Sequence, residues 1–435
     1  MPSQPGSGLE HVAGLRCLIC GREYRPDEVE YVCPHHGNEG ILDVQYDYAL
    51  IARRISQGDL LHSTDYSMWR YRPLLPIRAD APVPPLLVGW TPLVRAHQLA
   101  AELGLKGLWI KDEGRQPTGS LKDRASAIAV VKAREKGADV ITTASTGNAA
   151  AALAGLCASV RQRNVIFVPQ SAPPAKIAQL LVFGSQVLLV RGSYDDAFEL
   201  CLLAAQEYGW YNRNTAYNPY MTEGKKTAAL EICEQMGWQA PDVVLVSVGD
   251  GCIIGGLHKG FRDLYHLGWI DQIPRLIGVQ AAGSAYLYDA WVNREDVRTK
   301  PPIEAHTVAD SISAGLPRDR LKAMAAVCET NGAFICVSDE EILAAIPALA
   351  RGSGVFAEPA GAAAYAGLLK ALRNGQVRAD ERIVVLVTGN GLKDVQSAMR
   401  SVEQVGTRAH VVEKTFEDVR RVVQQFNRAK ESSSV

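Results

Sequence analysis

From about residue 88 onward, short apolar runs alternate with stretches that have a helical pattern. The short runs are rich in β-branched residues and are predicted to be strands. They cover residues 108–111, 140–143, 164–168, 186–190, 243–246, 276–279 and 383–387. Strands that are apolar throughout, with helices between them, are typical of parallel sheets covered on both faces. The pattern therefore predicts an α/β fold with doubly wound parallel sheets, in which ligands bind beyond the carboxyl ends of the strands.

The segments outside this region follow other patterns. Residues 1–15 are rich in Gly, Ser and Pro and are expected to form a flexible tail. Residues 47–84 combine a short helical pattern with a Pro-rich stretch, which is typical of a linker that wraps onto the next domain. Residues 401–435 contain a helical pattern at 416–428 and then a polar end. They are expected to form a C-terminal helix and tail.

Residues 16–46 carry a pattern of cysteines and histidines. Cys17 and Cys20 are followed, after a spacer of twelve residues, by Cys33 and then by two adjacent histidines. Two ligand pairs on short turns, separated by a hairpin-length spacer, suit a tetrahedral zinc ion. We expect a zinc-ribbon-like module whose ligands are Cys17, Cys20, Cys33 and His36, with His35 as the competing fourth ligand. The alternative is a ribbon that has lost its metal. Four protein ligands leave no open position for water, so such a site would be structural.

Charge and composition argue against several classes of function. The chain of 435 residues has 46 Lys and Arg against 47 Asp and Glu, so its summed charge gives no general attraction for nucleic acid or an acidic membrane surface. No stretch approaches the roughly 20 apolar residues that span a bilayer, and the N-terminus lacks the pattern of a secretion signal. Six cysteines stand singly in apolar or Gly-rich surroundings and are expected to be buried. They are Cys157, Cys201, Cys233, Cys252, Cys328 and Cys336. We expect a reduced, cytoplasmic protein.

Four short motifs each follow a predicted strand. Residues 116–124 read Gln-Pro-Thr-Gly-Ser-Leu-Lys-Asp-Arg and place Lys122 in the first turn of a helix. Residues 143–150 read Thr-Ala-Ser-Thr-Gly-Asn-Ala-Ala, and residues 248–256 form a Gly-rich turn whose backbone N–H groups suit a phosphate. Residues 388–393 read Thr-Gly-Asn-Gly-Leu-Lys, where a hydroxyl at a strand end could point at a ring nitrogen. Each motif alone also has an ordinary explanation as a turn or a helix cap.

Taken together, these motifs resemble the fold-type II pyridoxal-phosphate (PLP) enzymes, and within them most closely the threonine synthase group. The resemblance rests on the four motifs and on Glu-Pro-Ala-Gly at 358–361, and it spans roughly residues 15–400. An N-terminal zinc ribbon also occurs in members of that group. The resemblance implies a homodimer with PLP bound in a cleft between two lobes. The large lobe would be formed by residues 85–122 and 217–400, and the small lobe by residues 123–216.

The resemblance also implies roles for individual residues. Lys122 would hold the cofactor as a Schiff base, Asn148 would hydrogen-bond its ring hydroxyl, and Thr388 would face the pyridine nitrogen. The backbone of Gly249, Asp250, Gly251, Cys252 and Ile253 would hold the cofactor phosphate. Ser145, Thr146 and Ala149 would surround the substrate carboxylate. Once the substrate has displaced it, the amine of Lys122 can take the Cα proton and so serve as nucleophile and base in turn.

The implied reaction converts O-phospho-L-homoserine and water to L-threonine and phosphate, but two positions depart from the group's pattern. Met221 stands where the group carries an Arg that helps to bind the substrate phosphate, and Ala149 stands where Thr is usual. A thioether cannot replace a charged bidentate donor. One interpretation is that a nearby cation compensates, with Lys225, Lys226 and Arg213 as candidates. The other is a related enzyme acting at Cβ, such as a serine or threonine ammonia-lyase or a phosphoserine-using cysteate synthase.

Overall fold

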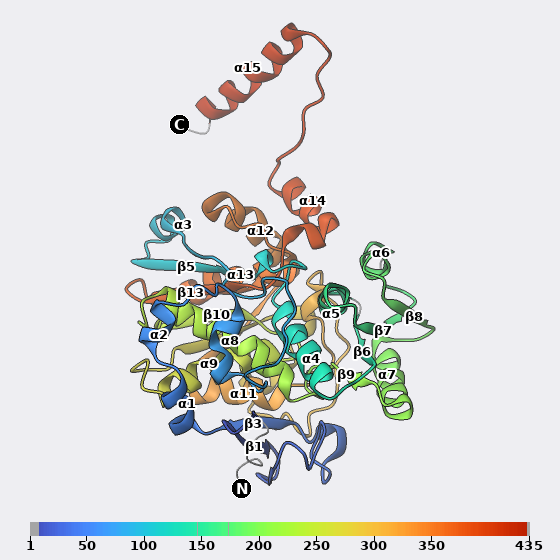
Figure 1. Cartoon of the computed structure of the whole chain (residues 1–435). Coiled ribbons are helices and arrows are strands. Elements are labelled where there is room, and N and C mark those ends of the chain that lie inside the picture. Colours follow the sequence, from blue (N-terminus) through green and yellow to red (C-terminus); the bar gives the residue numbers. More distant parts are fainter. Residues whose placement is uncertain (1–7, 146, 173, 433–435) are drawn as a thin grey trace.

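The computed structural model describes residues 8–145, 147–172 and 174–432, and this part of the chain contains three sheets (Figure 1). A small antiparallel sheet has the order β2-β1-β3. A six-stranded sheet has the order β12-β11-β10-β13-β5-β4, and a four-stranded sheet has the order β8-β7-β6-β9. Both larger sheets are parallel, except that β4 runs antiparallel to β5. The predicted α/β class with parallel sheets is therefore confirmed.

The strands are β1 (Val12–Cys17), β2 (Glu23–Tyr24), β3 (Leu42–Tyr46), β4 (Leu93–Arg95), β5 (Gly107–Asp112), β6 (Val140–Ala144), β7 (Arg163–Pro169), β8 (Gln186–Val190), β9 (Tyr211–Asn212), β10 (Val243–Ser247), β11 (Arg275–Ala281), β12 (Ala333–Val337) and β13 (Arg382–Val387). The first eight α-helices are α1 (Tyr48–Arg54), α2 (Gln57–Leu61), α3 (His97–Glu102), α4 (Lys122–Glu135), α5 (Asn148–Ser159), α6 (Pro174–Val182), α7 (Tyr194–Tyr208) and α8 (Tyr220–Gln235). They are followed by α9 (Cys252–His266), α10 (Tyr286–Asn293), α11 (Arg320–Glu329), α12 (Asp339–Ser353), α13 (Pro359–Arg373), α14 (Val395–Gln404) and α15 (Phe416–Ser432). The 3-10 helices are η1 (Gly37–Glu39), η2 (Met68–Leu74), η3 (Glu113–Arg115), η4 (Ala282–Ser284), η5 (Asp310–Ile312) and η6 (Gly391–Lys393).

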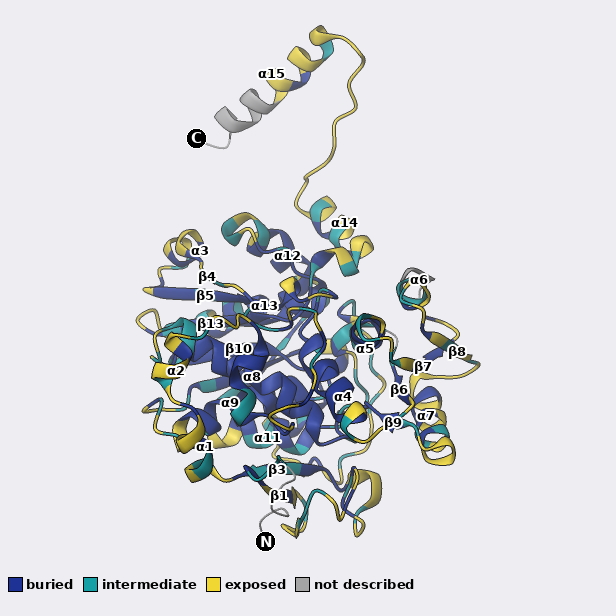
Figure 2. Cartoon of the chain, in the orientation of Figure 1, coloured by how far each residue is buried: buried dark blue, intermediate teal, exposed yellow. Residues whose placement is uncertain are grey.

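The six-stranded sheet is buried on both faces, because successive residues of its apolar strands point into two different cores. In β10, Val244 and Val246 join the core that includes helices α4, α8, α9 and α11. Val243 and Leu245 join the core that includes helices α3, α12 and α13. Figure 2 shows β10, α8 and α9 as a continuous buried region in the middle of the molecule.

In the four-stranded sheet, β7 is covered on both faces in the same way, whereas the edge strand β8 is largely exposed. Val165 and Phe167 of β7 pack with Phe198 and Cys201 of α7 on one face. Ile166 and Val168 pack on the other face with alanines of α5 and with Leu180 of α6. The two larger sheets place the carboxyl ends of several strands around one cleft, which is described below.

The segments at the two ends differ partly from expectation. The predicted tail 1–15 is too long, because β1 begins at Val12 and pairs with β3, and Val12 and Leu15 are buried. The Pro-rich segment after α2 contacts the following domain closely, since Trp69, Tyr71 and Leu74 are buried in the main core. Helix α15 lies apart from the rest of the molecule, joined to α14 by an extended segment (Figure 1).

The six singly placed cysteines are not all buried. Cys157, Cys201, Cys233 and Cys252 are buried as expected, Cys336 is partly exposed and Cys328 is exposed. Cys336 lies on β12, an edge strand, and Cys328 lies near the end of α11, so neither is enclosed on all sides. Among the helices that the structure describes, none combines the length and the apolar composition required to cross a bilayer.

Helices α4 and α8 approach so closely that one glycine has no room for a side chain. A Cβ at Gly224 would lie 2.1 Å from the carbonyl oxygen of Arg124. We expect Gly224→Ala to lower the free energy of unfolding by about 1–3 kcal/mol, because the two helix backbones must separate. Denaturant unfolding followed by circular dichroism measures this change.

Gly58 provides the matched control for that substitution. A Cβ at Gly58, in helix α2, would meet only Ser56 Oγ at an ordinary 3.6 Å. Gly58→Ala should leave stability unchanged or raise it by up to about 1 kcal/mol, because Ala favours the helix. Equal losses for both variants would contradict the proposed close contact.

Candidate active site

A cavity of about 460 Å³ lies beyond the carboxyl ends of strands β6, β7, β9 and β10. It is lined by Lys122, by the turns that start α5 and α9, and by residues 310–316 and Arg318. Nine of the predicted site residues line it: Lys122, Ser145, Asn148, Ala149, Gly249, Asp250, Gly251, Cys252 and Ile253. Thr146 lies outside the described residues, and Thr388 is not part of the lining. Motifs that are far apart in the sequence thus meet in one cleft.

Lys122 is the first residue of α4, and the turn before it is fixed by its neighbours. Asp123 accepts hydrogen bonds from Thr118 N at 2.7 Å and from Thr118 Oγ1 at 2.5 Å. Burial raises the pKa of Asp123 to about 6, although both hydrogen bonds from Thr118 act against that rise. The turn is also tied to the loop after β13, because Asn390 N donates to Gly119 O at 2.9 Å. These contacts hold the Lys122 side chain at the edge of the cavity.

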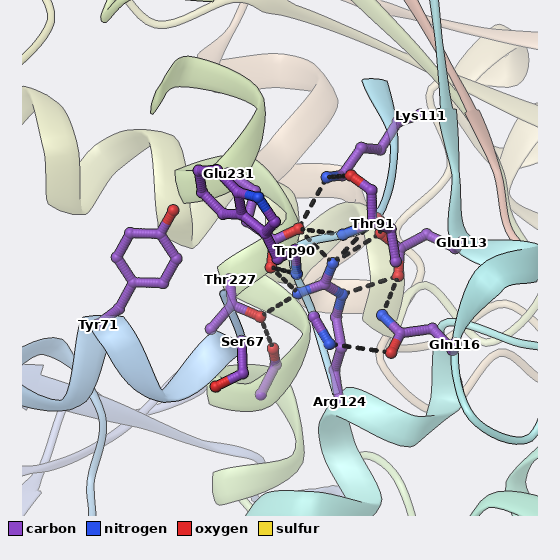
Figure 3. Close-up of polar contacts among 12 residues, drawn as sticks. Ser67, Tyr71, Trp90, Thr91, Lys111, Glu113, Gln116, Arg124, Thr227 and Glu231 are labelled. Carbon is purple, nitrogen blue, oxygen red and sulfur yellow. Dashed lines mark hydrogen bonds and ion pairs between the residues drawn. The ribbon is translucent and has the colours of Figure 1, made fainter. Parts of the chain in front are cut away.

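A buried network of charges anchors α4 from the side away from the cavity (Figure 3). Arg124 donates to both Glu113, at 2.7 and 2.8 Å, and Glu231, at 2.6 and 2.7 Å. Lys111 Nζ lies 2.7 Å from Glu231, and all four of these side chains are fully buried. Arg124 and Lys111 hold the pKa of Glu231 at about 2, although burial alone would raise it. The network joins β5, η3, α4 and α8, and so fixes the helix that begins with Lys122.

The start of α9 forms a cradle of backbone N–H groups. Its N-cap, Gly251, has φ +91, and no side chain caps the helix. A Cβ at Gly249 would lie 2.8 Å from Ile312 Cα, and a Cβ at Gly251 would lie 2.8 Å from Ala323 Cβ. Only glycine allows this close packing, and the residues at the uncapped helix start line the cavity. Such a helix start is a suitable place for an anion.

Asn148, the first residue of α5, is held by Glu358, which precedes helix α13. Its Nδ2 donates to Glu358 Oε1 at 2.6 Å and to Ser311 Oγ at 3.2 Å. Burial raises the pKa of Glu358, while the hydrogen bond from Asn148 and the charge of Lys393 lower it. The Glu-Pro-Ala-Gly segment therefore orients the amide of Asn148.

Thr388 is buried behind the cavity wall. Its Oγ1 lies 3.4 Å from Oγ of Ser247, and Ser247 does line the cavity. The Thr388 carbonyl oxygen accepts a hydrogen bond from Leu121 N at 3.0 Å, next to Lys122. The predicted hydroxyl is thus close to the site, but Ser247, at the end of β10, is the hydroxyl on the cavity surface. Its place at a strand end is the one sequence feature that indicates Ser247.

The cations considered as replacements for an Arg at position 221 differ in their surroundings. Lys226 faces away from the cavity, because its Nζ pairs with Glu223 and Asp263, at 2.7 Å each. Arg213 lines the cavity, and Lys225 donates to Thr215, which also lines it. Met221 is only 1% exposed and belongs to the main apolar core. Met221 therefore fills core space and is not part of the cavity lining.

Residues 310–316 and Arg318 also line the cavity, and no motif in the sequence indicates them. Two ion pairs cross from this loop to the four-stranded half. Arg318 Nη2 lies 2.6 Å from Asp195, at the start of α7, and Asp310 pairs with Lys176 of α6. These pairs hold the two halves of the molecule together at the cleft.

Away from the cleft, the N-terminal cysteines and one histidine converge. The donor atoms of Cys17, Cys20, Cys33 and His36 all lie within 4.8 Å of one another. His35 is directed elsewhere, since its Nε2 lies 2.5 Å from Arg22 Nη1. The choice of His36 over His35 agrees with this arrangement. Four donors placed tetrahedrally around a zinc ion at 2.0–2.3 Å would be about 3.3–3.8 Å apart, so little movement is required to bind one.

Comparisons with known proteins identify the family to which the chain belongs. The pyridoxal-phosphate dependent enzyme family matches residues 85–389. The threonine synthase of Methanocaldococcus jannaschii is 39% identical over 391 residues, which cover 89% of this chain and 95% of that protein. The chain belongs to the threonine synthase group of the pyridoxal-phosphate dependent enzymes. A second member of the group, the threonine synthase of Methanosarcina acetivorans, is 38% identical and covers 96% of this chain and 99% of its own length.

Solved structures share the fold of the group at lower identity. Threonine deaminase isoform 2 from Solanum lycopersicum superposes with a TM-score of 0.61 at 23% identity and covers 73% of this chain and 88% of its own. Diaminopropionate ammonia lyase from Escherichia coli gives a TM-score of 0.62 at 20% identity and covers 72% of this chain and 88% of its own. At these identities the likeness describes the fold alone.

Proposed function

We propose that this enzyme converts O-phospho-L-homoserine and water to L-threonine and phosphate, with PLP as its cofactor. The observation that carries the proposal is the identity of 38–40% to several proteins named threonine synthase over most of their lengths. The cleft adds support, because Lys122, Asn148 and the Gly-rich start of α9 line one cavity. The burial of Met221 in the core also removes an objection, since a substitution there does not alter the cavity surface.

The residues present fit the cofactor. The uncapped start of α9, where a Cβ at Gly249 or Gly251 would clash, suits a phosphate held by backbone N–H groups. Lys122 would hold the cofactor covalently, and Asn148, oriented by Glu358, would bond its ring hydroxyl. Ser247 or Thr388 would supply a hydroxyl at the ring nitrogen, and Ser145, Thr146 and Ala149 would bind the substrate carboxylate at the start of α5. When bound, PLP supplies an electron sink that stabilises negative charge at the substrate Cα.

Lys122 is proposed to act twice. Its amine would remove a proton from the substrate Cα and return it later in the reaction, once the substrate has displaced the lysine from the cofactor. A neutral hydroxyl at the ring nitrogen would not enforce a protonated ring as a carboxylate does, and this would favour loss of a leaving group over transamination.

The direct test is product analysis with the purified enzyme. Phosphate and L-threonine should appear together, in equal amounts, from O-phospho-L-homoserine. L-serine, L-threonine and O-phospho-L-serine should release neither keto acid nor phosphate at a comparable rate. Release of keto acid from serine or threonine, without turnover of phosphohomoserine, would replace the proposal by an ammonia-lyase acting at Cβ, and turnover of phosphoserine alone would indicate a cysteate synthase type.

We also propose that the N-terminal module binds one structural Zn²⁺ through Cys17, Cys20, Cys33 and His36. Cys20→Ser is expected to lower the zinc content from about one ion per chain to near zero and to lower the melting temperature, because metal binding and folding of such modules are coupled. Metal analysis after dialysis, together with thermal unfolding, measures both effects. Cys328→Ser, which removes an exposed cysteine outside the module, is the control and should change neither. A wild-type protein purified without any zinc would contradict the assignment.

The remaining features are proposed from membership of the group. The enzyme would act as a cytoplasmic homodimer on a small amino-acid substrate. Its large lobe would comprise residues 85–122 and 217–400, built on the six-stranded sheet, and its small lobe residues 123–216, built on the four-stranded sheet. Light scattering of the purified protein tests the dimer.

A further inference from the structure

A buried arginine lines the cleft without an acidic partner. Arg213 is 1% exposed and follows β9. Its Nε donates to Ser126 Oγ at 3.1 Å and its Nη1 to Thr215 Oγ1 at 3.3 Å, while Nη2 is buried and has no hydrogen-bond partner. Burial lowers the pKa of Arg213 to about 10, so the side chain is still charged at neutral pH. A buried charged donor left unpaired is costly, and such a group is expected to have a ligand.

Lys225 lies beside Arg213 and is also without a carboxylate. It is fully buried on α8, and its Nζ donates to Thr215 Oγ1 at 3.3 Å, the same oxygen that Arg213 contacts. Among the described residues, no acid lies within ion-pair distance of either cation. Asp319 is near Lys225, but its ion-pair partner is Lys322, at 3.9 Å. Asp123 is near Arg213, but it accepts hydrogen bonds from Thr118. Burial lowers the pKa of Lys225. Two basic groups therefore meet at one hydroxyl, and no carboxylate is paired with either of them.

The other two cationic side chains that line the cavity are assigned to the cofactor or paired with an acid. The described lining contains Lys122, Arg213 and Arg318. Lys122 is the proposed cofactor lysine, and Arg318 is paired with Asp195 at 2.6 Å and lies over the Phe198 ring. The proposed reaction requires two phosphate-binding sites, one for the cofactor and one for the substrate. The start of α9 offers backbone N–H groups for the first, which leaves Arg213 for the second.

We propose that Arg213 and Lys225, bridged by Thr215, bind the phosphate group of the substrate. This inference rests on the proposed function and specifies how the site recognises its substrate. The guanidinium can donate to a phosphate oxygen through its unpaired Nη2, and the ammonium supplies a second charge. Met221 can then pack in the core, because the cationic groups come from other positions. Arg213 lies in the connection between β9 and α8, and Lys225 lies one turn after Met221 on α8.

The test separates the phosphate of the substrate from that of the cofactor. The probe is L-2-amino-5-phosphonopentanoic acid, a stable phosphonate analogue of phosphohomoserine, with L-homoserine as the probe without phosphate. Binding to the PLP-loaded enzyme is followed by cofactor absorbance, and affinity for PLP is measured separately by equilibrium dialysis with the apoenzyme. Arg213→Met and Lys225→Met should each weaken phosphonate binding by about 10- to 100-fold, as expected for a lost charge-assisted hydrogen bond. Homoserine and PLP binding should change by less than about threefold.

Two further variants keep the test decisive. Arg213→Lys retains the charge in a smaller side chain and should weaken phosphonate binding by about 3- to 10-fold. This variant replaces Arg213→Met in the test if the methionine variant does not fold. Arg163→Gln removes an exposed cation far from the cleft and should change nothing. Equal weakening of PLP and phosphonate would assign the pair to the cofactor phosphate, and unchanged phosphonate binding would remove any role; either result overturns the inference.

The outcome for the inference differs from that for the proposed function. The wild type could fail to turn over phosphohomoserine and still bind the phosphonate more tightly than homoserine. If the variants then lose that preference, the phosphate subsite is supported and the proposed reaction is wrong. If the wild type makes threonine but the variants keep the preference, only the inference fails. A wild type that binds both probes equally has no phosphate subsite, which also overturns it.

Discussion

Lys122→Ala is expected to lower kcat for threonine formation by about 10³-fold or more, since positioned acid–base groups typically contribute 10²- to 10⁴-fold and this residue also holds the cofactor. The substitution should not unfold the protein. Lys122 is partly exposed at the first position of α4, and the anchoring contacts of the helix are made by Asp123 and Arg124. Steady-state kinetics, together with melting temperature and cofactor absorbance, distinguish loss of chemistry from loss of fold.

Lys122→Arg is the matched variant for this prediction. It keeps a positive charge and a long side chain, but a guanidinium stays protonated and cannot act as nucleophile or base at neutral pH. It should therefore be as inactive as the alanine variant. Lys106→Ala removes an exposed lysine before β5 and should retain full activity. If the arginine variant kept more than about a tenth of the activity, the role of Lys122 would be electrostatic only, and the assignment would be wrong.

The larger strands could be predicted from the sequence because each is a continuous apolar run between turn residues. All seven predicted runs correspond to strands of the two larger sheets. Strands β4 and β9 could not be predicted, since three and two residues are too few to carry a pattern. Strand β12, Ala333–Val337, was missed although it is apolar and follows an Asn-Gly turn. The sequence signal for a strand was therefore present at β12.

The site could be predicted only where a residue belongs to a short motif. Lys122, Asn148 and Gly249 each follow a strand, and strand ends gather at one cleft in such folds. Ser247 ends β10 directly before the 248–256 motif, but it belongs to none of the four motifs. The loop of residues 310–316 could not be found in this way, because it reaches the cavity through tertiary packing alone. The same applies to Met221. Its position in the sequence suggests the substrate site, but the packing of α8 buries it in the core.

The second large effect is expected in the buried charge network. Glu231→Gln should lower the free energy of unfolding by about 3–5 kcal/mol, the usual cost of removing one partner from a buried ion pair. Arg124 and Lys111 would lose their shared carboxylate, and the backbone N–H groups of Trp90 and Thr91, which also donate to Glu231, would lose a charged acceptor. The side chain changes little in volume, so the loss reports charge and hydrogen bonding. Urea unfolding followed by fluorescence measures it.

The pH dependence of this loss has a definite sign. The pKa of Glu231 is about 2 in the folded protein, below the ordinary value of 4.5. Below about pH 4.5 the unfolded chain binds a proton at this position that the folded protein does not, so the advantage of wild type over Glu231→Gln should shrink as pH falls from 5 toward 2. Glu30→Gln removes an exposed partner of Lys136 and should cost less than about 1 kcal/mol at any pH. A difference between wild type and Glu231→Gln that stayed constant down to pH 2.5 would mean that the carboxylate is not held ionised by Arg124 and Lys111, and that packing alone fixes the start of α4.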